Sequence, residues 1–236
     1  MEELQVNGTT IENLGVLDLI EMKPEDLGAV SLIQNVGLIL APESLTGALM
    51  KIPQKNVGLT VTLPPTTGKI KLLSGQLTVN GEVFANRLGS PEDILVITGQ
   101  IIITSTIETV GFKEVIVAGQ LIAPKKAESD LAAAVTRMTG QVAYYNSETP
   151  RLFVGEDTFS KAFFDFIDDK LAMVLVGSFE FDSDVDAALL KQKVSELVVI
   201  GELKAPKELV PLLQYLAVVK LGSIIGKDHE AIQSQP

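Results

Sequence analysis

The chain of 236 residues has no cysteine, no tryptophan and a single histidine. The absence of cysteine excludes disulfides, a thiolate nucleophile and cysteine-ligated metals. The histidine, His229, lies in a polar stretch at 227–236 that has no apolar periodicity and that we expect to be a disordered tail. A single histidine in a tail does not provide the residues for a Ser-His-Asp triad or for a histidine-ligated metal. We therefore expect no cofactor.

Aromatic residues and positive charge are also scarce. Aromatics make up 5% of the chain and its formal net charge is −11. We find no concentrated basic face for a phosphate backbone, which argues against nucleic-acid binding. No apolar run approaches the roughly 18 residues of a membrane helix, and the N-terminus MEELQVNGTT does not read as a secretory signal. We therefore expect a cytoplasmic protein without membrane insertion.

Glycine recurs in an apolar setting about every 21 residues. A period of this length is typical of a solenoid, in which each coil buries its apolar face only against its neighbours. Segments 82 residues apart share the pattern Gly-x-x-x-Ala-Pro, which indicates a duplicated unit of about four coils. The glycines of the series are Gly15, Gly37, Gly58, Gly75, Gly99, Gly119, Gly140, Gly155, Gly177, Gly201 and Gly222.

The residues around each glycine alternate and are rich in β-branched side chains, as in 115–123, which predicts a strand. Glycine inside a strand indicates a bulge, a bend or a close approach to the next coil, and we favour the last two. Proline at Pro24, Pro42 and Pro206 then opens short helical segments. The prediction is an α/β solenoid: a parallel β-sheet of about 21-residue coils, some with short helices on the return. It forms a single domain at 1–226 of about 10–11 coils.

A strand, a tight turn and a short helix in each coil resemble the leucine-rich-repeat family, most clearly at 197–213, LVVIGELKAPKELVPLL. That resemblance implies a parallel sheet on one face and a protein partner. The family's recurring asparagine is missing, since Asn35, Asn56 and Asn80 share no register. A right-handed parallel β-helix with helical insertions is the alternative architecture.

A polar residue follows the glycine in eight coils, beginning with Gln76, Gln100, Gln120 and Gln141. If coils stack about 4.8 Å apart, these side chains form a row whose amides can bond along the axis. The row is either a solvent-side ladder or a binding stripe.

The repeat slips at Gly155, within a segment (144–169) that holds most of the aromatic residues. Either these side chains plug the core at an irregular junction, or they form a surface for a partner. The candidate binding residues are Tyr144, Tyr145, Phe153, Phe159 and Phe163.

Two classes of function remain. The first is a non-enzymatic interaction or structural scaffold, which binds another protein or associates with itself through uncapped end coils. The second is a carbohydrate-active enzyme with paired carboxylates 5 to 9 Å apart. Its candidate residues are Glu156, Asp157, Glu180, Asp182 and Asp184. The alternative is that these residues are solvated acids in turns. We favour the scaffold.

Overall fold

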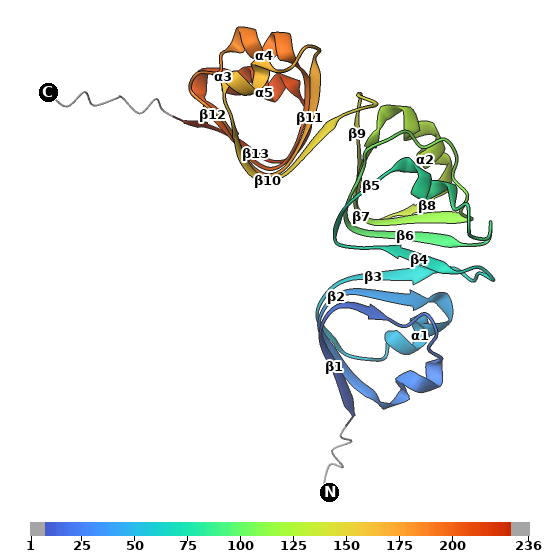
Figure 1. Ribbon diagram of the computed structural model, residues 1–236. Helices are drawn as coiled ribbons and strands as arrows, with labels where there is room; N and C mark the ends of the chain where they lie inside the picture. The colour runs from blue at the N-terminus through green and yellow to red at the C-terminus, as the bar shows by residue number, and fades with distance from the viewer. Residues whose placement is uncertain (1–7, 228–236) are drawn as a thin grey trace, which may run out of the picture. The chain divides into compact units, whose positions relative to one another are not determined.

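A computed structural model describes residues 8–227 of the chain (Figure 1). The chain divides into two compact units, Met1–Lys69 and Ile70–Pro236, and each is described here by itself. The predicted tail at 227–236 lies outside the described residues except for Lys227, which ends the last strand. The single domain at 1–226 stays a prediction.

The first unit contains a three-stranded parallel sheet, the first sheet, in which each strand pairs with the next along the chain. Short helical segments follow the first two strands, and their leucines Leu27, Leu45 and Leu49 pack against Leu17 and Ile39 of the sheet. Its elements are β1 (Thr9–Asp18), η1 (Pro24–Ala29), β2 (Val30–Pro42), η2 (Glu43–Leu45), α1 (Thr46–Leu49) and β3 (Gln54–Leu63).

The second unit begins with a six-stranded parallel sheet, the second sheet, built on two long strands. Pairs of shorter strands lie on either side: β4 and β5 both pair with β6, and β8 and β9 both pair with β7. Its elements are β4 (Ile70–Leu73), β5 (Gln76–Val79), η3 (Gly81–Ala85), β6 (Ile94–Ile103), β7 (Glu114–Pro124), η4 (Lys125–Ala127), α2 (Glu128–Ala134), β8 (Val135–Met138) and β9 (Gln141–Tyr145).

A four-stranded parallel sheet, the third sheet, completes the second unit, with the strands in chain order. Figure 1 shows these long strands bending near their middle, around the short helices that connect them. The elements are β10 (Arg151–Phe159), α3 (Lys161–Asp165), β11 (Leu171–Phe181), α4 (Ala187–Lys193), β12 (Val194–Pro206), η5 (Lys207–Leu209), α5 (Val210–Leu216) and β13 (Ala217–Lys227). The prediction of parallel sheets with short helices between strands is confirmed.

The glycines form a ladder in each sheet, because the strand register places them side by side. Gly155, Gly177, Gly201 and Gly222 are direct partners across the third sheet. A Cβ added to Gly58 would lie 2.5 Å from the carbonyl oxygen of Gly37, and most later members are tighter still. The predicted close backbone approach is confirmed, and it explains why no side chain is tolerated there.

The bend itself needs a left-handed residue, and the sheets meet this need differently. In the third sheet Gly155, Gly177 and Gly201 have φ between 108° and 132°. In the first sheet asparagines two positions before the glycines take this role, with φ of 52° to 60°; they are Asn13, Asn35 and Asn56. Asparagine tolerates this conformation better than other side chains that carry a Cβ.

The prediction that the asparagines share no register is wrong for the first sheet. The Asn35 amide donates to the Asn13 side-chain oxygen (3.1 Å), and the Asn56 amide donates to that of Asn35 (2.9 Å). In the second sheet the predicted glutamine row is confirmed for three members. The Gln76 amide donates to the Gln100 oxygen and that of Gln100 to Gln120, both at 2.8 Å.

Segments 82 residues apart adopt the same order of elements. Strands β2, β7 and β12 all end at a proline, and a 3-10 turn and a short α-helix follow each of them. Within residues 8–227 no helix is both long and apolar enough to cross a membrane.

The second and third sheets pack together through the faces that point away from their helices. Val174 and Val198 of the third sheet belong to one buried cluster with Ile102, Ile122 and Tyr145 of the second. This cluster buries apolar side chains on both sheets at the junction where the glycine spacing slips.

Candidate functional site

The predicted aromatic binding residues lie in two places, and two of them are fully buried. Tyr145 is 0% exposed and Phe159 is 1% exposed. Neither side chain reaches a surface where a partner could touch it, so their assignment to a binding patch is corrected to a role in the core. Tyr145 fills the contact between the second and third sheets, whereas Phe159 packs in the core between the third sheet and its helices.

Tyr145 is held by its hydroxyl group as well as by its ring. The hydroxyl donates to the main-chain oxygen of Ile103 at 2.5 Å, two strands away in the second sheet. Burial, and secondarily the carboxylate of Glu196, raises the pKa of Tyr145. The residue is therefore a neutral hydrogen-bond donor inside the protein at physiological pH.

The other three candidates are half-buried. The rings of Phe153 and Phe163 pack against Phe159, with centroids 5.0 and 4.8 Å away, and the Arg151 guanidinium lies over both. Tyr144 packs against the core of the second sheet with Lys125 5.4 Å above its ring. Burial, and then the charge of Glu128, raises its pKa.

The exposed apolar side chains of the irregular segment are ones that the prediction did not select. Phe166, just after α3, is 89% exposed, and Val154 on β10 is also exposed. Phe166 could not be separated from the buried phenylalanines by sequence, because the segment 161–170 is too short for its apolar face to be identified.

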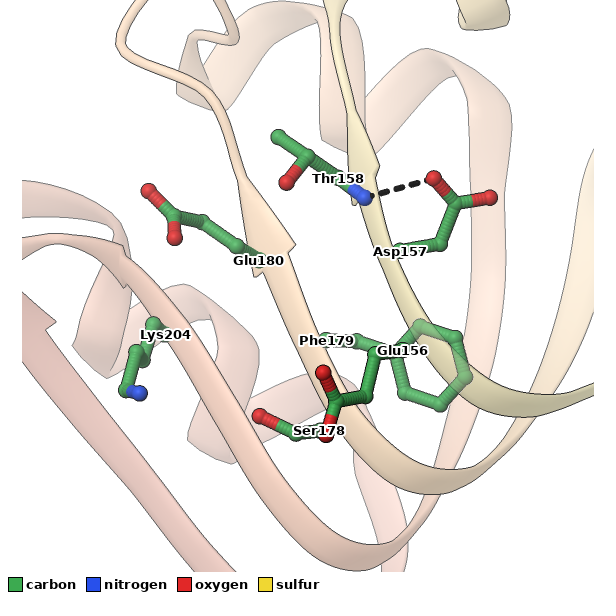
Figure 2. Close-up of a pocket in the computed structure, with 7 residues that line it drawn as sticks. All are labelled: Glu156, Asp157, Thr158, Ser178, Phe179, Glu180 and Lys204. Carbon is green, nitrogen blue, oxygen red and sulfur yellow. Dashed lines mark hydrogen bonds between the residues drawn. The ribbon is translucent and has the colours of Figure 1, made fainter.

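The predicted carboxylates come together in part, in a hollow of about 380 Å³ on the third sheet (Figure 2). Glu156 on β10, Glu180 on β11 and Lys204 on β12 all line it. The register explains this proximity, since Glu156 pairs with Ser178 and Glu180 pairs with both Thr158 and Lys204. We call this set the acidic hollow; its lining is Glu156, Asp157, Thr158, Ser178, Phe179, Glu180 and Lys204.

Two lysines compensate the negative charge of the acidic hollow. The Lys204 ammonium lies 2.6 Å from Glu202, and Lys227 forms an ion pair with Glu180. The hydrogen bond that Lys204 donates to Glu202, followed by the charges of Glu202, Glu180 and Glu156, raises the pKa of Lys204. Negative and positive side chains therefore alternate across the hollow. Ion pairs at a surface of this kind contribute little to the free energy of unfolding.

The acidic hollow has no exposed aromatic platform for a sugar ring. Its one aromatic residue, Phe179, is buried and stacks on Phe159 with ring centroids 5.8 Å apart. In the part of the chain that the structure describes, no group of three or more acidic, histidine or cysteine side chains could hold a metal ion.

Asp182 and Asp184 do not join the hollow. Asp182 accepts from the main-chain N–H of Ser183 (2.6 Å), and Asp184 accepts from that of Lys161 (2.9 Å). Their neighbour Asp186 caps α4 by accepting from the N–H of Leu189 (2.8 Å). These three carboxylates fix turns and a helix end. They are therefore turn acids with a structural role.

A buried carboxylate that the sequence did not reveal joins the second and third sheets. Glu196 on β12 is 5% exposed. Its oxygens accept from the main-chain N–H of Asn146 (3.0 Å), the Asn146 side-chain amide (2.9 Å) and the N–H of Ser147 (2.5 Å). Three donors from the turn after β9 thus satisfy this buried carboxylate.

A second buried polar network holds the loop between η3 and β6. The Asn86 amide donates to Asp93 (3.2 Å) and to the Gly111 main-chain oxygen (3.1 Å), and Lys71 donates to Asn86. Gly89 lies so close to Asn86 and Asp93 that a Cβ would collide with both. These contacts, within the loop and to Lys71 and Gly111 outside it, account for the buried polar atoms, and no ligand is needed to explain them.

Strands β1 and β13 are edge strands that carry exposed apolar side chains. Among residues 8–227, β1 pairs only with β2, and β13 pairs only with β12. Leu14 and Val16 are exposed on β1, and Val218 and Ile225 on β13. Unpaired edges of this length present a row of N–H and C=O groups that another strand can bind.

Comparison with known proteins assigns no relative: no family model matches the chain, and no curated protein or solved structure matches it.

Proposed function

We propose that this protein is a non-enzymatic scaffold: a solenoid of parallel coils whose end strands bind protein. The observation that carries the proposal is the pair of edge strands β1 and β13, each ten or more residues long and paired on one side only within the described residues. Natural sheets usually protect such edges by covering, charging or shortening them. Strand addition to an open edge supplies main-chain hydrogen bonds and is a common mode of protein recognition.

The rest of the molecule supports a structural role. The residues that recur from strand to strand are the glycines of the ladders and the asparagines and glutamines of the rows. The glycines allow close backbone approach, and the amides form hydrogen bonds between neighbouring strands. The solenoid architecture, and with it the likeness to leucine-rich repeats, is part of this proposal, because the comparisons offer no family to test it against.

Site-resolved crosslinking tests the scaffold. A photoreactive amino acid replaces Val16 on β1, Val218 on β13 or, as the control, Tyr215, which is exposed on α5. We expect protein crosslinks from both edge positions in the native cell extract and few from the control. Equal or absent crosslinking at all three positions would contradict the edges as the binding surface.

The alternative, a carbohydrate-active enzyme, rests on Glu156 and Glu180 of the acidic hollow. A retaining or inverting glycosidase needs two such carboxylates with room for a sugar between them. We expect no release of reducing sugar from a panel of polysaccharides. Hydrolysis that is lost in both Glu156→Gln and Glu180→Gln, with the fold retained, would replace the scaffold by the enzyme.

A further inference from the structure

The two edge strands carry opposite charge. Strand β1 contains Glu12 and Asp18 and no basic residue, whereas β13 contains Lys220 and Lys227 and no acidic residue. Lys220 is exposed and has no ion pair among the residues that the structure describes. Lys227 forms an ion pair with Glu180 of β11, so Lys220 supplies the positive charge of this edge. The two edges are therefore electrostatically complementary to each other.

The glycine ladder is complementary at the same two edges. Within each sheet, the missing Cβ of a glycine leaves room for the carbonyl oxygen of the preceding glycine, at 2.7 Å for Gly37 against Gly15. Gly15 itself has no atom within 4 Å on that side, so its space is open. Gly222, the last glycine of the third sheet, pairs with Gly201 on one side and has no following strand within the described residues.

We infer that the partner of these edges is a second copy of this chain. Strand β13 of one molecule pairs in parallel with β1 of the next, and the Gly222 carbonyl occupies the open space beside Gly15. Lys220 then lies near Glu12, because the two residues precede their glycines by two and three positions. The inference rests on the proposed scaffold function and names its partner.

Such a contact joins two different surfaces, so it is heterologous and does not close by a two-fold axis. Each molecule keeps one unused edge after the first contact, and association therefore continues beyond the dimer into rings or open chains. Strand β10 is the other edge of the third sheet. It carries both positive and negative charge, on Arg151 and on Glu156 and Asp157, so it is less complementary to the lysines of β13 than β1 is.

The experiment uses three variants of the full chain and sedimentation velocity over a wide concentration range. Gly15→Ala fills the open space, and Lys220→Glu places two carboxylates against each other at the contact. Gly47→Ala is the control, because Gly47 is exposed in α1 and equally free of neighbours. The wild type and the control should associate as concentration rises, and each edge variant should associate at least about tenfold more weakly.

Mixing the two edge variants gives the decisive result. Gly15→Ala retains an intact β13 edge and Lys220→Glu retains an intact β1 edge, so an equimolar mixture should form a dimer that neither variant forms alone. No dimer in the mixture, or association that Gly15→Ala leaves unchanged, overturns the inference. A wild type that stays monomeric overturns it too, whereas edge crosslinks to a different protein would leave the scaffold function standing.

Discussion

Gly37 faces the main-chain carbonyl of Gly15 so closely that a methyl group on Gly37 would lie 2.7 Å from its oxygen. The relationship is one-sided, since a methyl group on Gly15 would meet no atom within 4 Å. Neither glycine has a positive φ, so the difference between the two sites is purely steric. An added methyl group is thus excluded at Gly37 and accommodated at Gly15, although the two glycines are neighbours in one ladder.

Replacing Gly37 by alanine should therefore lower the free energy of unfolding by about 1–3 kcal/mol, the usual cost of overpacking. Gly15→Ala should leave it unchanged within about 0.5 kcal/mol. Urea unfolding of dilute protein, followed by circular dichroism, measures both. Equal effects of the two substitutions would contradict the close approach as the reason for the glycines.

Asn35 combines a left-handed backbone with two side-chain hydrogen bonds, and two substitutions separate these contributions. Asn35→Gly keeps the backbone relaxed but removes the bonds, at a cost of about 0.5–1.5 kcal/mol per bond. Asn35→Ala adds left-handed strain of about 1–2 kcal/mol. We expect the alanine variant to unfold at a lower urea concentration than the glycine variant; the reverse order would show that the bend needs no left-handed residue.

Glu196 should be the most important carboxylate for stability. Glu196→Gln turns an NH2 group toward main-chain donors of Asn146 and Ser147, and it should cost about 1.5–3 kcal/mol. Glu202→Gln on the same strand is the matched control. It removes only a surface ion pair with Lys204, worth at most about 1 kcal/mol. Similar losses for the two variants in thermal unfolding would argue against the Glu196 contacts as a joint between the sheets.

Tyr145 predicts an alkaline loss of stability. Burial raises its pKa in the folded protein, so the folded state keeps the phenolic proton above pH 10, where the unfolded chain releases it. Its contribution is complete below about pH 10 and declines by up to about 1.4 kcal/mol per pH unit above it.

Tyr145→Phe should cost about 1 kcal/mol at neutral pH, through loss of the bond to Ile103, and should show a shallower alkaline decline. Tyr215→Phe, at an exposed site, should change neither quantity. Parallel pH curves for the wild type and Tyr145→Phe would rule out a buried, titrating Tyr145.

The strand pattern could be read from the sequence because it is local. Alternating β-branched residues around Gly119 and the proline at Pro206 specify strand and helix start within a few residues of themselves. The glycine register followed from the same spacing, since parallel strands of equal period align equal positions. The asparagine row could not be predicted from the glycine spacing, because the first sheet bends two residues before Gly37, whereas the third sheet bends at its glycines.

The candidate site was less predictable, because burial at the junction depends on contacts between distant segments. Tyr145 and Phe166 look alike in a stretch rich in aromatics, yet one fills the contact between two sheets and the other is exposed. Glu196 meets Asn146 across 50 residues, and no local pattern marks it. The carboxylates of the acidic hollow could be predicted in part, because the glycine register places Glu156 opposite Ser178, two residues before Glu180.

Hydrogen exchange of the wild-type chain at low and high concentration tests most directly the claim that the end strands are the interaction surface. We predict that main-chain amides of β1 and β13 gain protection as concentration rises, while those around the acidic hollow on β10 and β11 do not change. Protection that rises at the hollow and leaves both end strands exchanging as in the dilute protein would contradict the account.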